Sequence, residues 1–300
     1  MSFMIFLIGF VVGSFIDLNL SKAIYDKNNT FGLIISILGT IPGYGSITLL
    51  GGIFLYTGLK RNDFKLFIRI LFIILAIAAF ITATYYSGRE IFGVNGFYNS
   101  KLKFIGYIIS APIMCLFGFG GYFIALKSNN KYLWLLTVII VIAFFIILVP
   151  GTSLLKIIFN RPRYRTVSLD EAENVGIIFK NWWQRTGNYK DLITTFNNTN
   201  TISITSEEFK SFPSGHVSSA FLFSSLALFL PIMDKKYEKI SLPLFCGGLI
   251  WTLLVGFARI RVGAHFLSDV SMGGMLAVIF SFIANEVIMR LKYFKQEIGE

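Results

Sequence analysis

Long apolar runs dominate the chain, and short polar segments separate them. The runs cover residues 2–19, 31–58, 65–86, 104–126, 132–156, 217–233, 241–258 and 268–289. Each is roughly long enough to cross a bilayer as an α-helix, which needs about 20 apolar residues. The runs lack the polar–apolar alternation of membrane barrel strands, and a helix satisfies its own backbone hydrogen bonds in lipid. We therefore predict an all-α fold, a polytopic bundle of about eight transmembrane helices.

Composition agrees with a lipid environment. Hydrophobic residues make up 55% of the chain and charged residues 14%, and the charges cluster between the runs. The net charge of +11 raises the question of nucleic acid, but no basic face with interleaved aromatic residues occurs, so we expect no nucleic-acid partner. Cys115 and Cys246 both lie in apolar runs, which argues against a disulfide and against a cysteine metal site.

Basic residues in the short loops predict an orientation. These loops are residues 60–65, 127–131 and 235–239, and the tail 290–295 is basic too. They fall on one side of the membrane if the spans are counted correctly, and the positive-inside rule makes that side cytoplasmic. We then expect both termini in the cytoplasm and the long loop, residues 157–216, on the outer face. No lysine or arginine precedes the first run, so we expect a retained span there, not a signal peptide.

The long loop carries an amphipathic segment at residues 170–185. Its apolar positions recur at roughly helical spacing and are Val175, Ile178, Phe179, Trp182 and Trp183. Tryptophans are typical of headgroup depth, so we predict an interfacial helix that serves as a membrane anchor or a lid. We divide the chain into N-terminal spans, residues 1–130, and a catalytic core, residues 131–300, that contains this loop.

The chain has only two histidines, His216 and His265, and each stands where an apolar run meets a polar connection. A histidine alone is more often structural than catalytic. Ser214 and Gly215 precede His216 directly before a predicted helix, where backbone amides point at an anion. The plainer interpretation is an N-capping turn in which Ser214 satisfies those amides, and both are compatible.

Around the second histidine, Asp269 follows His265 at a spacing that puts both side chains on one face of a helix. A carboxylate there holds one ring nitrogen protonated and leaves the other free to attack. The alternative is that Asp269 caps the last span and Arg259 anchors the preceding one at the membrane surface. Ionisable groups at the ends of membrane spans are candidates for functional residues, which favours the catalytic interpretation.

A third group of charges lies at the end of the fifth run, and its members are Lys156, Arg161, Arg163 and Arg165. Ammonium and planar guanidinium groups bind phosphate oxygens and neutralise charge that develops during phosphoryl transfer. The alternative is a basic patch for acidic lipid headgroups.

In their order and spacing, these segments resemble the type 2 phosphatidic acid phosphatase superfamily, whose signature is Lys-x6-Arg-Pro, Pro-Ser-Gly-His and Ser-Arg-x5-His-x3-Asp. The matching positions are Lys156 and Arg163, then residues 213–216, then Arg259, His265 and Asp269. Two positions depart from the signature, because Tyr164 stands in place of proline and Ala258 in place of serine. The resemblance covers residues 156–269 and the adjoining spans.

The resemblance implies a membrane lipid phosphatase that needs no metal and no cofactor. His265 would be the nucleophile that forms a phosphohistidine, Asp269 would orient its ring, and His216 would be the general acid and base. The phosphate would be held by Lys156, Arg163, Arg259, Ser214 and Gly215, with Arg161 as an accessory candidate. Phosphatidate, phosphatidylglycerophosphate and polyprenyl diphosphate all qualify as substrates, and the oligomeric state stays open.

Three other functions compete with this prediction. A lipid phosphotransferase would use the same residues but pass the phosphoryl group to an acceptor other than water. A transporter would carry charges at several span centres, whereas here they gather at one face. A vanadate-dependent haloperoxidase shares the residue set by family resemblance, but those relatives are typically soluble, and the apolar runs argue against it.

Overall fold

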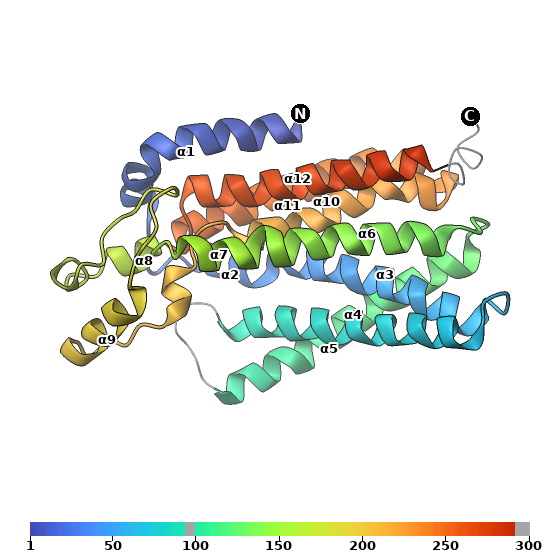
Figure 1. Cartoon of the computed structure of the whole chain (residues 1–300), viewed down its shortest axis with the longest axis horizontal. Helices are drawn as coiled ribbons and strands as arrows, with labels where there is room; N and C mark the ends of the chain where they lie inside the picture. The colour runs from blue at the N-terminus through green and yellow to red at the C-terminus, as the bar shows by residue number, and fades with distance from the viewer. Residues whose placement is uncertain (94–99, 292–300) are drawn as a thin grey trace. The chain divides into compact units, whose positions relative to one another are not determined.

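The computed structural model describes residues 1–93 and 100–291, and no β-strand occurs among them (Figure 1). Its helices are α1 (Ser2–Ile24), α2 (Thr30–Leu38), α3 (Ile41–Lys60), α4 (Leu66–Gly93), α5 (Ser100–Lys127), α6 (Leu133–Leu148), α7 (Leu155–Phe159), α8 (Tyr164–Val167), α9 (Tyr189–Thr199), α10 (Gly215–Met233), α11 (Glu238–Arg261) and α12 (Leu267–Arg290). The predicted all-α class is confirmed.

Within the described residues, eight helical stretches are long and apolar enough to cross a membrane. They match the predicted spans in number and position, which fits a multi-pass membrane protein. One predicted run, residues 31–58, is interrupted by a turn at residues 39–40. Pro42 follows in the first turn of α3, where its missing N–H removes no helical hydrogen bond. The predicted tail charges Lys292 and Lys295 lie outside the described residues.

The helices form two compact units. Unit 1 consists of Met1–Ser36, Ile146–Ser218 and Thr252–Val278. Unit 2 consists of the described residues of Ile37–Phe145, Ser219–Trp251 and Ile279–Glu300. Every residue proposed from the sequence as part of the site belongs to unit 1. That unit takes residues from both sides of the predicted division at residue 130, which stays a prediction.

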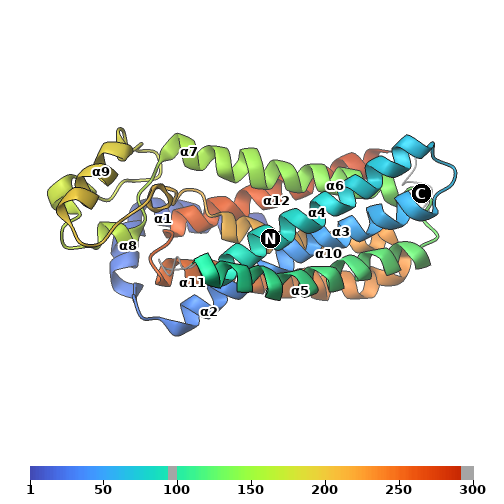
Figure 2. The same cartoon turned by 90° about the horizontal axis from the view of Figure 1, so that it is seen from below.

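In unit 2, α3, α4 and α5 pack side by side (Figures 1 and 2). Glycines allow the backbones of α3 and α5 to approach closely. A Cβ on Gly52 would collide with the carbonyl oxygen of Gly118, and one on Gly121 would collide with that of Leu49. Side chains at these positions would therefore force the two helices apart.

Hydrogen bonds connect the basic loops of unit 2 to one another. Arg61 Nη1 donates to the carbonyl oxygen of Lys131 at 2.9 Å. Asn130 Nδ2 donates to the carbonyl oxygen of Ile232 at 2.8 Å, at the end of α10. The loops that carry the predicted cytoplasmic lysines thus gather at one end of this unit.

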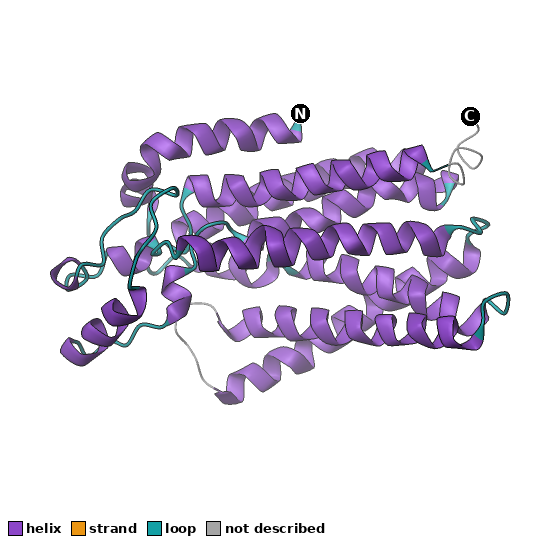
Figure 3. Cartoon of the chain, in the orientation of Figure 1, coloured by secondary structure: helices purple, strands orange, loops and turns teal. Residues whose placement is uncertain are grey.

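The predicted interfacial helix at residues 170–185 is wrong. This segment contains a short 3-10 turn, Glu173–Val175, and otherwise irregular chain, drawn as loop in Figure 3. Gly176 follows the turn with φ of +81°, a left-handed conformation that ends helical structure. The helix of this loop is α9, further along the chain.

Two aromatic side chains of that segment, Phe179 and Trp182, pack against other residues of unit 1. Trp182 donates through Nε1 to Ser14 Oγ at 2.9 Å, and its ring stacks on Phe212 with centroids 5.7 Å apart. Phe179 meets Phe266 edge to face at 5.2 Å. Phe179 and Trp182 thus contact residues of unit 1, whereas Ile178 and Trp183 of the same pattern are exposed.

Residues 168–210, which we call the loop lobe, have a hydrophobic core of their own. Its buried members are Ala172, Ile177, Phe196, Ile204 and Phe209. A packed core gives the loop a defined shape, so its backbone can hold side chains of the site in place.

Candidate active site

Lys156 lies on α7, which continues from α6 through a π-helical turn, Val149–Leu154. Such turns are frequent at functional sites. A Cβ placed on Gly215 would lie 3.4 Å from Nζ of Lys156. The ammonium group therefore lies against the turn that begins α10, where glycine leaves room for it.

The loop lobe holds Arg163 by its backbone and its side chain. Its N–H donates to the carbonyl oxygen of Glu208 at 2.8 Å, and its Nε donates to that of Glu207 at 2.9 Å. The Glu208 carboxylate accepts from Arg165 Nη2 at 2.6 Å and from Thr166 Oγ1 at 2.7 Å. Burial alone raises the pKa of Glu208, but the hydrogen bond and charge of Arg165 outweigh it and lower the pKa to about 2.

The turn before α10 brings the two histidines together. Ser214 Oγ accepts from Val217 N–H at 3.5 Å, so Ser214 caps this helix, as the plainer interpretation expected. Its own N–H donates to the carbonyl oxygen of Asp269 at 2.9 Å, which ties the turn to α12. The ring of His216 lies 6.4 Å from that of His265, centroid to centroid.

His265 is completely buried between α11 and α12. Its Nδ1 lies 2.6 Å from the carbonyl oxygen of Ser211 and 3.9 Å from the nearest oxygen of Asp269. A carbonyl oxygen only accepts, so Nδ1 carries the proton and Nε2 has a free lone pair. That Nε2 is buried and has no hydrogen-bond partner among the residues that the structure describes.

The helical spacing predicted that Asp269 would hold the His265 ring directly. It does not, because other donors occupy the carboxylate oxygens of Asp269. Oδ2 accepts from Ser211 Oγ at 2.5 Å and from Phe266 N–H at 2.8 Å, and Oδ1 accepts from Arg161 at 2.5 Å. Ser211 therefore connects the two, since its hydroxyl binds Asp269 and its carbonyl binds His265. Ser211 could not be singled out from the sequence, because no motif distinguishes it from the chain's other serines.

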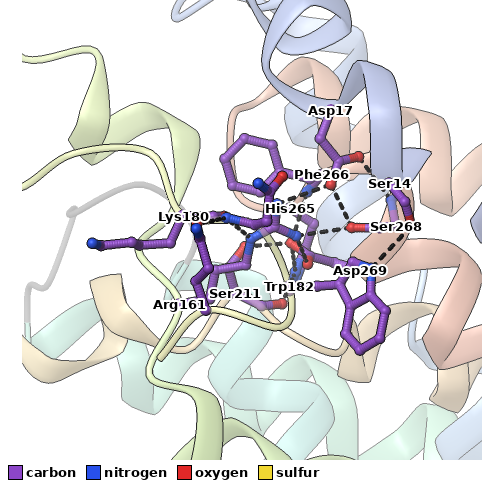
Figure 4. A network of polar contacts seen from close by, with 12 residues as sticks. Ser14, Asp17, Arg161, Lys180, Trp182, Ser211, His265, Phe266, Ser268 and Asp269 are labelled. Atoms are coloured by element: carbon purple, nitrogen blue, oxygen red, sulfur yellow. Dashed lines mark hydrogen bonds and ion pairs between the residues drawn. The ribbon is translucent and has the colours of Figure 1, made fainter. Parts of the chain in front are cut away.

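Arg161, which we predicted as an accessory phosphate ligand, donates to groups of the protein itself. It is completely buried, and each of its three nitrogens is occupied within the protein (Figure 4). Nε donates to the carbonyl oxygen of Lys180, Nη1 to Ser268 and Asp269, and Nη2 to Asp17, at 2.5–2.9 Å. Asp17, on α1, was also missed, although an acidic residue inside an apolar run is itself a functional signal.

Both departures from the family signature are buried. Tyr164 meets Tyr25 edge to face at 5.2 Å and Phe266 at 6.2 Å. Ala258 is completely buried within α11. Tyr164, which stands where the signature has proline, thus packs against Phe266, the residue that directly follows His265.

The electrostatics of the site centre on His265. Burial lowers its pKa well below the ordinary value of 6.5, and the positive charges of Arg163, Arg259 and Lys156 lower it further, against a raising effect of Asp269. The carbonyl oxygen of Arg259 also accepts from the His265 N–H at 3.3 Å. A neutral imidazole close to cations suits a substrate that brings its own negative charge, such as a phosphate.

The described part of the chain contains no cluster of three or more His, Cys, Asp or Glu side chains that could hold a metal ion. The cations around His265 offer an alternative source of positive charge. A mechanism without a metal stays a prediction.

Comparison with known proteins connects this geometry to a family. The family model described as the PAP2 superfamily matches residues 131–293. The chain is 32% identical over 92 residues to phosphatidylglycerophosphatase B of Bacillus subtilis (strain 168), a match that covers 29% of this chain and 43% of that protein. The matched region is thus less than half of that relative's length. No solved structure matches the chain.

Proposed function

Since the chain belongs to the PAP2 superfamily, we propose that it is a membrane lipid phosphatase with His265 as its nucleophile. The observation that carries the proposal is the hydrogen bonding of the two ring nitrogens of His265. Its Nδ1 is occupied by the Ser211 carbonyl, and its Nε2 is buried without a hydrogen-bond partner among the described residues. A free lone pair on a positioned neutral imidazole is what nucleophilic attack on phosphorus requires.

In the proposed reaction, Lys156, Arg163 and Arg259 bind the phosphate oxygens, and Nε2 of His265 attacks phosphorus. The bond from phosphorus to the lipid oxygen breaks, and His216 gives that oxygen a proton. A water molecule then gives a proton to His216 and attacks phosphorus. The nitrogen–phosphorus bond breaks, and inorganic phosphate leaves.

Asp269 would support this reaction electrostatically. Its carboxylate lies 3.9 Å from Nδ1 of His265, close enough to stabilise the positive charge that the ring acquires on phosphorylation. Through Ser211 it would also keep the ring oriented. Neither role requires the direct hydrogen bond that the spacing predicted.

The proposed substrate is a lipid whose phosphate lies at headgroup depth. His216 and His265 lie at the ends of long apolar helices, where headgroups meet the hydrocarbon core. Phosphatidylglycerophosphate is the first candidate because the similar B. subtilis protein is a phosphatidylglycerophosphatase, and phosphatidate and polyprenyl diphosphates are the others. Transfer to another acceptor remains the second candidate function, and an acceptor assay separates it from hydrolysis.

We further propose that the site faces the outer side of the membrane. The helix α10 begins at Gly215, beside His216, and ends at Met233, just before the basic segment 235–239. A crossing helix has its two ends on opposite faces, and the positive-inside rule places the lysines in the cytoplasm. Labelling of single cysteines with an impermeant reagent in intact cells tests this, and label at residue 236 from outside would contradict it.

The activity is tested by phosphate release from the three lipid classes in detergent with a chelator present. We expect native turnover, almost complete loss in His265→Ala, and strong loss in Lys156→Ala. Lys190→Ala removes an exposed lysine of the loop lobe and is the matched control that should keep native turnover. Turnover that stops with chelator and returns with a divalent ion would overturn the metal-free reaction, and transfer to an acceptor without release would favour the transferase.

A further inference from the structure

A carboxylate from outside the family match takes part in the buried network behind the site. Asp17 lies on α1, whereas the family match begins at residue 131. Its Oδ2 accepts from Arg161 Nη2 at 2.9 Å and from Ser268 Oγ, and its Oδ1 accepts from Ser268 N–H at 2.9 Å (Figure 4). Only 3% of its surface is exposed.

The position of Asp17 calls for a physical reason, because burying a carboxylate in an apolar helix is unfavourable without strong partners. Its partner Arg161 is completely buried as well, and its guanidinium lies over the ring of Phe266 at 4.1 Å and near that of Phe179 at 5.4 Å. Arg161 also binds Asp269. One guanidinium thus holds two carboxylates, one from α1 and one from the site.

The second partner of Asp17 is the first turn of α12. The N–H of Ser268 has no acceptor within its own helix at this position, and the Asp17 carboxylate supplies one. Close packing makes this possible, since a Cβ on Gly13 would lie 3.0 Å from Cα of Ser268. The helix α1 therefore holds the start of α12, which directly follows His265 and carries Asp269.

We propose that Asp17 is a positioning residue of the active site, so that α1 is part of the catalytic machinery. Through Arg161 and Ser268 it fixes Asp269, Asp269 fixes the hydroxyl of Ser211, and the carbonyl of Ser211 orients His265. Asp17 binds no substrate in this scheme. The inference rests on the proposed phosphatase function.

The test is Asp17→Asn, measured as kcat and KM for lipid phosphate release. We expect kcat to fall about 10- to 100-fold, the effect of one charge-assisted hydrogen bond expressed in the transition state. KM and inhibition by inorganic phosphate should stay within about twofold, because the phosphate-binding cations are unchanged. Loss of a negative charge near Arg161 should also lower the pKa of His265, and the acidic limb of the kcat profile should therefore move to lower pH.

Asp26→Asn is the matched control, since it makes the same chemical change just after α1. Asp26 pairs with Arg261 at 3.3 Å, and both side chains are partly exposed, so kcat should stay within about twofold. If Asp17→Asn does not accumulate, Ser268→Ala removes one of the partners of Asp17 and keeps every charge. This variant should lower kcat about 3- to 10-fold.

The outcomes separate the two proposals. Native kcat in a folded Asp17→Asn or Ser268→Ala protein would overturn the role of Asp17 and leave the phosphatase proposal intact. A changed inhibition constant for phosphate with unchanged kcat would make Asp17 part of substrate binding, and this too would overturn it. Absence of phosphate release from the native protein would refute the function, and the inference with it.

Discussion

The connection from Asp269 to His265 through Ser211 makes a sharp prediction for Ser211→Ala. The change removes the hydroxyl that donates to Asp269 at 2.5 Å but leaves the backbone carbonyl that binds His265 at 2.6 Å. A buried hydrogen bond to a charged group contributes about 1.5–3 kcal/mol. If the whole amount is lost in the transition state, kcat falls about 10- to 160-fold, at 1.36 kcal/mol for each factor of ten.

The assay is steady-state phosphate release in detergent, with kcat and KM measured separately. KM should stay within about twofold, because Ser211 lies behind the histidine and not among the phosphate-binding cations. Ser225→Ala is the control, since it removes a buried hydroxyl of unit 2 that bonds Ser281 at 2.6 Å. If Ser211→Ala keeps native kcat while Asp269→Asn loses it, Asp269 acts on His265 directly and the path through Ser211 is wrong.

Three further measurements test the surroundings of the site. His265 must be neutral to attack, so kcat/KM falls on an acidic limb as the pH drops through the pKa of His265, and burial puts this limb below pH 6.5. Arg163→Ala removes a cation that lowers the pKa of His265, so it should move the limb to higher pH. Ionised Glu208, whose pKa falls from 4.5 to about 2, contributes up to about 3 kcal/mol of stability above pH 4.5 that disappears toward pH 2, so Glu208→Gln should lower the unfolding midpoint in detergent at pH 7 and the difference should shrink in acid. Gly263 has φ of +65°, and a Cβ there would lie 2.9 Å from the Arg165 nitrogen, so Gly263→Ala should destabilise the protein by at least about 1 kcal/mol, and a native midpoint would contradict this geometry.

Hydropathy alone determined the helical class and the number of candidate spans. A spanning helix satisfies its backbone within about 20 consecutive residues, so its signal is local and can be read along the chain. The motif spacings likewise pointed to His216, His265 and three cations. The structure gathers these residues in unit 1, and their chemical roles stay proposals.

The tertiary structure decided which groups bind one another. A spacing of four residues places Asp269 near His265. The carboxylate oxygens of Asp269 nevertheless accept from Ser211, Phe266 and Arg161 instead. A carboxylate has few lone pairs, and donors from distant segments compete for them, so spacing cannot decide the outcome. For the same reason the sequence could not show that Arg161 is buried and bonded to Asp17, Ser268 and Asp269.

The helical periodicity at residues 170–185 did not produce a helix, because the spacing of apolar residues alone fixes neither the backbone of a loop segment nor the burial of its side chains; Ile178 and Trp183 are exposed. The left-handed Gly176 and the carbonyl of Lys180, which accepts from Arg161, need an irregular chain there. The sequence by itself therefore determined the spans and the candidate chemistry, which depend on neighbouring residues. Only the tertiary structure decided the hydrogen-bond partners, those of Asp17 included, because these depend on donors and acceptors from segments far apart in the chain.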